Sequence, residues 1–317
     1  DLVLATSTPL TIGIPALIKK TFHRTPYIFE VRDVWPEAVV AIGAIKNKAM
    51  VKLLYKLEYI IYKGAKFIVP LSTDMQKSIV GRFPEFQEKA KCVIPNISEV
   101  DRFLVKDIDQ EEKSRFFTNL IGSVPTLSVL YAGTCGKVNN IDYLLALAKQ
   151  VQTINPNIVF LLLGGGSEKP RLELLAKEMG ILNVNLFFLA SIPKQELPKL
   201  YNHVSMGSSF VAPIKALWAN SANKFFDTLA AGKPILINHG GWQADVIKQH
   251  KIGYVLNHEL NADDVKNFIS YLSNEDQLKI SGSKAREVAK DNYALQIASQ
   301  NYFHLINTIA KEQKILK

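Results

Sequence analysis

Short apolar runs alternate with amphipathic segments along almost the whole chain, and this alternation constrains the fold more than any other feature. Between the runs, apolar residues recur at helical spacing, for example over 10–20 and 141–151. Strands that alternate with helices at this pitch form parallel sheets with right-handed crossovers. We therefore predict an α/β fold, with strands at 3–6, 27–31, 67–71, 91–96, 127–133, 159–163, 184–188, 206–211, 235–238 and 253–255.

A change of character divides the chain into two predicted domains. Charge rises and periodicity fades over 99–125, which we interpret as a linker with one short helix between domains at 1–98 and 126–292. Asp107 and Asp109 lie in this charged run rather than at the end of an apolar strand, which favours solvation over metal binding. Residues 1–6 resemble a buried strand with no leading loop, so we expect part of the first domain to precede them.

Composition narrows the class of protein. An apolar content of 48% and a charged content of 21% are typical of soluble globular proteins, and no apolar window is long enough to span a membrane. Cys92 and Cys135 are the only cysteines, which fits a reducing compartment such as the cytoplasm. The six histidines show no paired ligand spacing, so a structural zinc site is not indicated.

The net charge of +9 is concentrated in the first third of the chain, where residues 1–100 hold 14 Lys and Arg against 9 Asp and Glu. Such a surface suits nucleic acid or an anionic membrane, but no nucleic-acid-binding module is visible. A predicted helix over 47–63 combines a wide apolar stripe with several lysines. It either lies on the inner face of the membrane or packs on the core with solvated lysine heads.

Three strand ends carry candidate ligand groups, because ligands bind at the carboxyl ends of strands in open α/β sheets. Arg32 and Asp33 follow the strand at 27–31, where a local ion pair is the alternative interpretation. Glycine-bearing loops follow two later strands, at 134–140 and 164–166, and glycines let backbone approach a ligand closely. Neither matches a G-x-G-x-x-G motif or a P-loop, so each is weak evidence alone.

The stretch 219–238 predicts a helix with a polar first turn. Ser221 is the expected N-cap and Gly232 the expected C′ residue. Asn223, Lys224 and Asp227 then lie near the positive helix end, where phosphate and sugar hydroxyls can bind. A capped surface helix with solvated polar groups is the alternative.

Four segments together carry a resemblance that covers nearly the whole chain. They are 26–37 (PYIFEVRDVWPE), 94–96 (IPN), 131–137 (YAGTCGK) and 223–234 (NKFFDTLAAGKP). With them the chain resembles retaining GT-B glycosyltransferases of family 4, and most closely the bacterial branch that builds O-antigen and capsular polysaccharides.

This resemblance implies two Rossmann-like domains that face each other across a cleft, with the helix from about residue 293 crossing back to the first domain. The second domain is expected to bind a UDP-sugar and the first an acceptor, without metal or other cofactor. The implied diphosphate and sugar contacts are Gly133, Thr134, Gly136, Lys137, Gly164, Gly165, Gly166, Asn223 and Lys224, with Asp227 on the ribose. Arg32 and Asp33 fall in the catalytic region, where many relatives have a His.

The leading hypothesis is transfer of the sugar to a saccharide or lipid-linked acceptor with retention of configuration. Lys137 and Lys224 would stabilise the departing diphosphate, assisted on the acceptor side by Arg32 and Asp33. Ala219 occupies the position where relatives carry the first Glu of an E-x7-E pattern. That departure keeps open a nucleotide-sugar-binding protein without transferase activity, and a nucleotide-sugar 2-epimerase is a further alternative.

Overall fold

The computed structural model describes residues 1–7 and 9–315, which divide into two compact units. Unit 1 comprises Asp1–Ile97, Ile214–Ser221 and the helix that begins at Leu295. Unit 2 comprises Ser98–Pro213 and Ala222–Ala294. The expected linker at 99–125 therefore clusters with unit 2, and the short segment at 214–221 clusters with unit 1.

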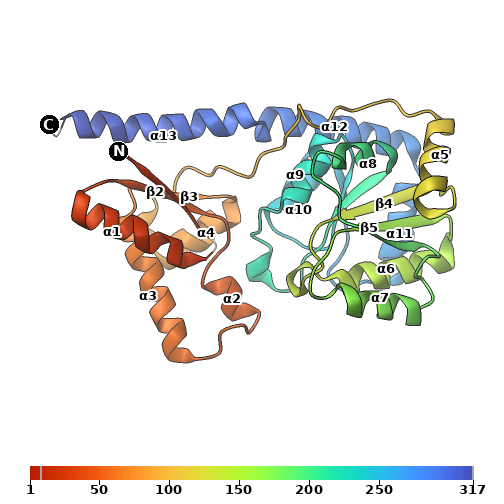
Figure 1. Ribbon diagram of the computed structural model, residues 1–317, viewed down its shortest axis with the longest axis horizontal. Coiled ribbons are helices and arrows are strands. Elements are labelled where there is room, and N and C mark those ends of the chain that lie inside the picture. Colours follow the sequence, from red (N-terminus) through yellow and green to blue (C-terminus); the bar gives the residue numbers. More distant parts are fainter. Residues whose placement is uncertain (8, 316–317) are drawn as a thin grey trace. The chain divides into compact units, whose positions relative to one another are not determined.

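Unit 1 is built on a three-stranded parallel sheet in the order β1–β2–β3 (Figure 1). Phe29 and Tyr62 pack together in a cluster on one face of the sheet, with ring centroids 5.9 Å apart. The neighbouring Ile28 points to the opposite face, where it meets Leu305 and Ile309 of the last helix. The elements are β1 Val3–Thr6, η1 Leu10–Ile12, α1 Gly13–His23, β2 Tyr27–Val31, α2 Glu37–Ala41, α3 Lys48–Gly64, β3 Phe67–Pro70, α4 Thr73–Arg82, η2 Pro84–Phe86, η4 Lys215–Leu217 and α13 Leu295–Ile315.

Unit 2 is built on a six-stranded sheet in the order β6–β5–β4–β7–β8–β9, in which every neighbouring pair is parallel. The parallel α/β prediction is thus confirmed in both units. The elements are α5 Gln110–Ile121, β4 Leu127–Ala132, η3 Lys137–Asn139, α6 Ile141–Ile154, β5 Ile158–Leu163, α7 Lys169–Glu178, β6 Leu186–Leu189, α8 Leu197–His203, β7 Met206–Ser209, α9 Asn223–Ala230, β8 Ile235–Ile237, α10 Trp242–His250, β9 Gly253–Val255, α11 Ala262–Leu272 and α12 Glu275–Tyr293.

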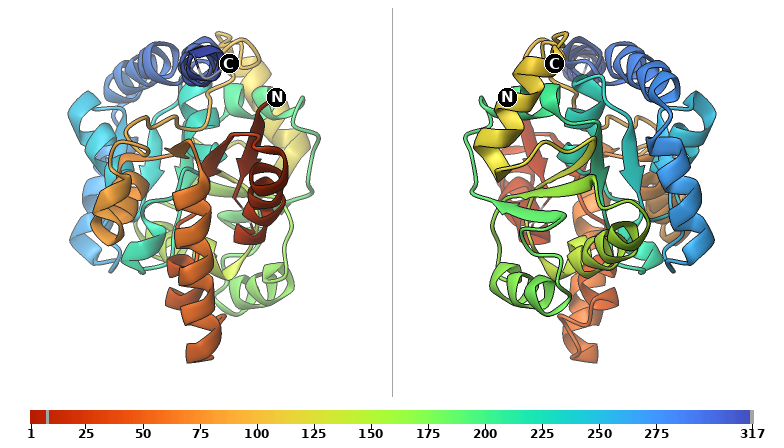
Figure 2. Two further views of the ribbon diagram at one scale, coloured as in Figure 1. Left: turned by 90° about the vertical axis from the view of Figure 1, so that its left-hand side faces the viewer. Right: turned by 90° about the vertical axis from the view of Figure 1, so that its right-hand side faces the viewer.

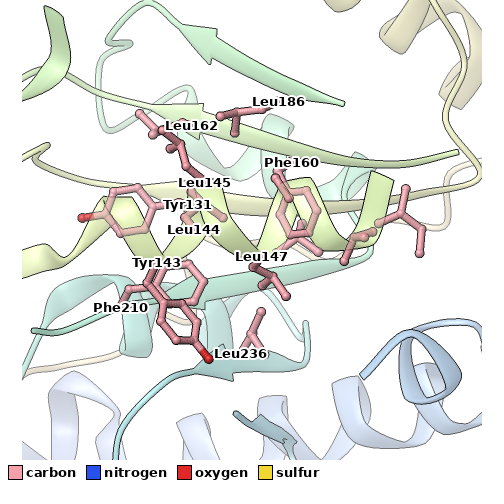
Figure 3. Close-up of a cluster of buried hydrophobic side chains, with 14 of the residues drawn as sticks. Tyr131, Tyr143, Leu144, Leu145, Leu147, Phe160, Leu162, Leu186, Phe210 and Leu236 are labelled. Carbon is pink, nitrogen blue, oxygen red and sulfur yellow. The ribbon is translucent and has the colours of Figure 1, made fainter. Parts of the chain in front are cut away.

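A large hydrophobic cluster of unit 2 lies between its sheet and the helices α6, α7 and α11, and Figure 3 shows part of it. Three aromatic rings gather at one end of this core: Phe210 lies 5.7 Å from Tyr143 and 6.2 Å from Tyr131, between ring centroids. The Tyr131 hydroxyl donates a hydrogen bond of 2.9 Å to the carbonyl oxygen of Thr134. The packed aromatic layer therefore supports the first residues of the loop that follows β4.

The predicted strand at 91–96 is wrong. These residues form no strand, although the amide of Ile94 donates to the carbonyl oxygen of Pro70 at 3.1 Å. An apolar run becomes a strand only beside a partner strand, and local pattern does not reveal whether one is present.

Asp109 caps α5 through the amide of Glu112 at 2.7 Å, so the acidic run at 107–112 leads into a helix.

Helix α3 projects from unit 1, with its N-terminal end pointing away from the sheet (Figures 1 and 2). Asn47 caps it by accepting from the amides of Ala49 and Met50. The first buried residue is Glu58, whereas Met50 and Leu53 are 48% and 59% exposed. The leading half of the helix therefore does not belong to the core. In the described part of the chain, no helix is both long and apolar enough to cross a membrane.

Candidate functional site

The candidate site in unit 2 lies at the carboxyl edge of the sheet, where the strand order reverses. From the central strand β4 the chain first adds β5 on one side and later adds β7 on the other. Loops after such neighbouring strands diverge and leave room for a ligand, as in other doubly wound sheets. The loop at 133–136 follows β4, and α9 begins after the loop that follows β7.

The loops after β4 and β5 are joined backbone to backbone. The amide of Gly133 donates to the carbonyl oxygen of Leu163 at 2.9 Å, and the amide of Cys135 donates to that of Gly165 at 2.7 Å. Gly164 and Gly166 have φ angles of 140° and 143°, and a Cβ on either would overlap backbone atoms of the opposite loop. Their first role is therefore packing of one loop on the other.

Gly165 differs from its two neighbours in this respect. A Cβ built there would make only an ordinary contact, at 3.9 Å from Ser191 Oγ. The sequence predicts that Gly164, Gly165 and Gly166 all face the ligand, but a Cβ at Gly164 or Gly166 would overlap the opposite loop, so these two glycines are needed for packing. Sequence could not separate them, because the opposing loop lies about thirty residues earlier in the chain.

Lys224 reaches over the loop that follows β4. Its Nζ donates to Asn139 Oδ1 at 3.3 Å and lies 5.2 Å from the centre of the Tyr131 ring. A Cβ on Gly133 would come within 2.8 Å of Lys224 Cε, so this glycine makes room for the lysine side chain. Burial lowers the pKa of Lys224 to about 8. The ammonium therefore lacks the solvation it needs, and an anionic ligand would compensate for that loss.

The N-terminus of α9 supplies backbone donors beside this lysine. Ala222 is the N-cap, and no side chain caps the helix, which corrects the expected cap at Ser221. Ser221 instead belongs to unit 1, where its carbonyl oxygen accepts from Asn96 Nδ2 at 2.5 Å. An N-terminus without a side-chain cap favours an anion. The expected C′ glycine is confirmed, since Gly232 has a φ of 63° directly after the C-cap Ala231.

Asp227 lies one turn after Asn223 on α9. Its side chain is buried, whereas Asn223 is exposed. Its Oδ1 lies 4.0 Å from Lys194 Nζ, which also pairs with Glu99 at 2.6 Å. Burial raises the pKa of Asp227 to about 6, against the opposing effect of Lys194. The carboxyl is therefore partly protonated near pH 6 and can both donate and accept hydrogen bonds there.

The other predicted donor-binding residues, Thr134, Gly136 and Lys137, lie on the segment that follows β4. Thr134 and Lys137 are exposed, Gly136 precedes η3, and Lys137 is the first residue of η3. Four groups were not predicted to contribute: Tyr131 and Asn139, which contact Lys224, and Lys194 and Glu99, which form an ion pair beside Asp227. Two of them had a signal in the sequence: Asn139 as a polar residue of the glycine-bearing loop, and Tyr131 as the first residue of the segment 131–137 that carries the family resemblance.

Arg32 and Asp33 belong to unit 1, whereas the donor-side residues described above belong to unit 2. Arg32 pairs with Glu30 at 3.2 Å and donates to Asn96 Oδ1 at 3.3 Å, so its ion pair is with the residue two positions earlier. Glu30 also accepts from Tyr302 of α13 and from Thr6. Arg32 is thereby held at the end of β2 by groups from three separate segments.

Ala219 also lies in unit 1, where its side chain packs in an apolar cluster with Val34, Leu71 and Met75. Its carbonyl oxygen accepts a hydrogen bond of 2.7 Å from Ser72 Oγ. A carboxylate at this position would be buried among apolar side chains, which is costly. The absence of Glu at 219 is therefore consistent with the local packing.

Within 1–7 and 9–315, no group of three or more His, Cys, Asp or Glu side chains is arranged to hold a metal ion.

A family model described as "Glycosyl transferases group 1" matches residues 122–291, which is more than half of the chain. Spore coat protein SA of Bacillus subtilis is 22% identical over 242 residues, and this match covers 74% of the chain but only 63% of that relative. The chain thus spans less than two thirds of the length of this curated relative.

Solved structures agree on the fold. The crystal structure of Anabaena Alr3699/HepE in complex with UDP matches with a TM-score of 0.78 at 13% identity, over 97% of this chain and 79% of that one. Sucrose-phosphate synthase from Thermosynechococcus elongatus matches with a TM-score of 0.76 at 16% identity, over 98% and 74%. The expected GT-B-like fold is confirmed, and the match to the family model shows that this chain belongs to the group 1 glycosyl transferases.

Proposed function

We propose that the chain transfers a sugar from a UDP-sugar to a saccharide or lipid-linked acceptor, with retention of configuration and without a metal ion. The observation that carries the proposal is Lys224, a poorly solvated cation between the glycine loop after β4 and the N-terminus of α9. The choice of UDP is motivated by Anabaena HepE, whose crystal structure is a complex with UDP.

The chemical demand in such a transfer is the departure of a diphosphate as the bond to the anomeric carbon breaks. Lys224 and Lys137 would offset the charge that develops on the leaving oxygen, and the first amides of α9 would donate to it. Backbone at Gly133, Thr134, Gly136 and Gly164–Gly166 would approach the nucleotide, and Asn223 would contact the diphosphate or the sugar. Asp227 is the proposed partner of the ribose hydroxyls.

On the acceptor side we propose Arg32 and Asp33. The guanidinium of Arg32 is oriented by Glu30 and Asn96, which supports a role in binding an acceptor hydroxyl or an anionic group next to it. Asp33 is the weaker candidate for a base, and orientation of the acceptor is its proposed role.

A peripheral membrane contact, with the protein on the cytoplasmic side, belongs to the same proposal. The exposed leading half of α3 carries Met50 and Leu53 beside Lys48, Lys52 and Lys56. Apolar side chains flanked by lysines favour a surface of anionic lipid, where a lipid-linked acceptor would be found.

The test is NMR detection of UDP release and of the anomeric proton of the product, over a panel of UDP-sugars with and without lipid-linked acceptor. We expect release of UDP and a product with the configuration of the donor. Lys224→Ala should reduce turnover at least about tenfold, since it removes a charge-assisted contact to the leaving group. Lys199→Ala, on the exposed surface of unit 2, is the control and should leave turnover unchanged.

Two outcomes would select the alternatives. Binding of UDP without release from any donor would favour a nucleotide-sugar-binding protein, an alternative supported by the apolar surroundings of Ala219. Formation of a C2 epimer without acceptor would favour an epimerase. Turnover by Lys224→Ala at the wild-type rate would remove the proposed role of Lys224.

A further inference from the structure

A cavity of about 680 Å³ opens at the amino-terminal edge of the unit 1 sheet. Pro26 precedes β2 and Lys66 precedes β3, and both line the cavity. Arg32 follows the other end of β2, a five-residue strand that spans roughly 17 Å. The cavity is therefore separate from the acceptor-side residues proposed above, and all its lining residues belong to unit 1.

The lining of this cavity combines an apolar floor with a basic rim. Ala65 and Leu305 are buried, with 2% and 4% of their surface exposed, and Phe67 is partly exposed. Five Lys and Arg side chains line the cavity against two Glu, so positive charge exceeds negative charge by three. The charged lining residues are Lys20, Arg24, Lys66, Lys89, Lys91, Glu88 and Glu312, and His304 is also present.

The cations are crowded, and their existing contacts leave donors available. Lys20 Nζ donates to the carbonyl oxygen of Gly64 at 2.5 Å. Lys89 Nζ donates to the carbonyl oxygens of Lys63 at 2.7 Å and Tyr62 at 3.4 Å. Both lysines therefore serve the C-terminal end of α3, but an ammonium has three N–H donors. Burial lowers the pKa of Lys89, and the charges of Lys20, Lys66 and Lys63 lower it further. Charges that repel one another in this way gain from a shared anion.

We propose that this cavity is a second anion site, which binds a phosphate group. Lys66 pairs with Glu312, and Lys91 pairs with Glu88 at 3.3 Å, so the acidic residues neutralise only part of the rim. Arg24 contributes a planar guanidinium suited to bidentate contact with phosphate oxygens. The apolar floor can take the part of the ligand next to the phosphate. The phosphate belongs either to a soluble compound or to a lipid headgroup, and the site does not depend on the proposed transferase activity.

Cys92 lines the cavity and provides a local readout. It is half-buried, whereas Cys135, the other cysteine, is fully buried in unit 2. The rate of Cys92 alkylation by iodoacetamide is measured by peptide mass spectrometry. If the phosphate belongs to a soluble compound, pyrophosphate at about ten times its dissociation constant leaves about a tenth of the cavities open, so alkylation should slow about tenfold. Potassium chloride at the same ionic strength should have no such effect.

A second arm uses vesicles of phosphatidylcholine, alone or mixed equally with phosphatidic acid. Protection by pyrophosphate but not by phosphatidic acid identifies a soluble phosphate, and the reverse result identifies a lipid headgroup. Either result supports the site. Protection by neither probe would overturn it.

Variants separate this cavity from general charge and from the donor site. The double variant Arg24→Gln, Lys91→Gln should abolish protection, whereas Lys77→Gln, Lys199→Gln removes two exposed lysines elsewhere and should keep it. Lys91, Lys77 and Lys199 each pair with an acidic residue three positions away, so these lysines are matched in their ion pairing. Lys224→Ala should also keep protection. Undiminished protection in the first variant, or its loss in either of the other two, would refute the proposal.

Discussion

At the scale of single residues, Lys224 combines an unfavourable environment with a position suited to binding an anion. Burial lowers its pKa to about 8, although Asn139 and the Tyr131 ring lie within reach of its ammonium. These two contacts do not replace full hydration of a cation. Residues that are poorly solvated in the free protein are typical of binding sites, where a ligand supplies the missing partner.

The lowered pKa of Lys224 makes the stability of the fold depend on pH. The unfolded chain keeps the proton of Lys224 up to about pH 10.5, whereas the folded chain releases it above about pH 8. Because the unfolded state binds more protons in this range, stability should rise with pH between 8 and 10.5 through this group. Lys224→Met keeps an unbranched side chain but does not titrate. Urea unfolding should find it more stable than wild type at pH 7, with the difference shrinking towards pH 10.5. A difference independent of pH would contradict this reasoning.

At the scale of elements, the paired loops after β4 and β5 form the rigid part of the site. Their backbone hydrogen bonds join Gly133 to Leu163 and Cys135 to Gly165. Such a pairing occupies the amides of Gly133 and Cys135 and fixes the backbone between them before any ligand binds. Pre-organised backbone dipoles of this kind give the largest electrostatic effects in catalysis.

Gly164→Ala and Gly165→Ala form a matched pair that tests this loop pairing. At Gly164 the φ of 140° and the nearby carbonyl oxygen of Gly133 both oppose a Cβ, so unfolding free energy should fall by about 2 kcal/mol or more. At Gly165 the Cβ has room, and the change should stay within about 1 kcal/mol. Chemical denaturation measures both. Equal losses would mean that the loops are not joined as described.

The leading half of helix α3 lies outside the core of unit 1 and exposes Met50 and Leu53. Substitution of three lysines on its exposed half, Lys48, Lys52 and Lys56, by Gln should weaken binding to anionic vesicles by about 3 kcal/mol, roughly a hundredfold. Flotation with phosphatidylglycerol vesicles measures this. The matched control replaces three exposed lysines of unit 2: Lys149, Lys177 and Lys199. Unchanged flotation of the α3 variant would remove the membrane proposal.

At the scale of the whole molecule, the sequence predicted what depends on local pattern and missed what depends on distant partners. The alternation of strands and helices follows from apolar spacing that recurs within a few residues. Ser221 has a typical capping side chain, yet Asn96 binds it from 125 positions away. Ala219 likewise packs on Leu71 and Met75. No local signal separates the segment at 214–221 from the unit that follows it.

The candidate site was predictable to the same extent. Loops at strand ends, the glycines and Lys224 follow from the α/β pattern together with family resemblance. The separate roles of Gly164 and Gly165, the contact of Lys224 with Tyr131, and the buried setting of Asp227 depend on tertiary packing. These features distinguish residues such as Gly164, which hold the loops together, from residues such as Gly165, which have room for a ligand nearby.

The most direct test of the central claim is a calorimetric titration with UDP at pH 7. The wild-type chain should bind one UDP, and Lys224→Ala should bind about 2 kcal/mol more weakly, roughly thirtyfold. Lys199→Ala should bind as wild type does. A wild-type chain that takes up no UDP, or a Lys224→Ala variant that binds it equally well, would contradict the assignment of this site.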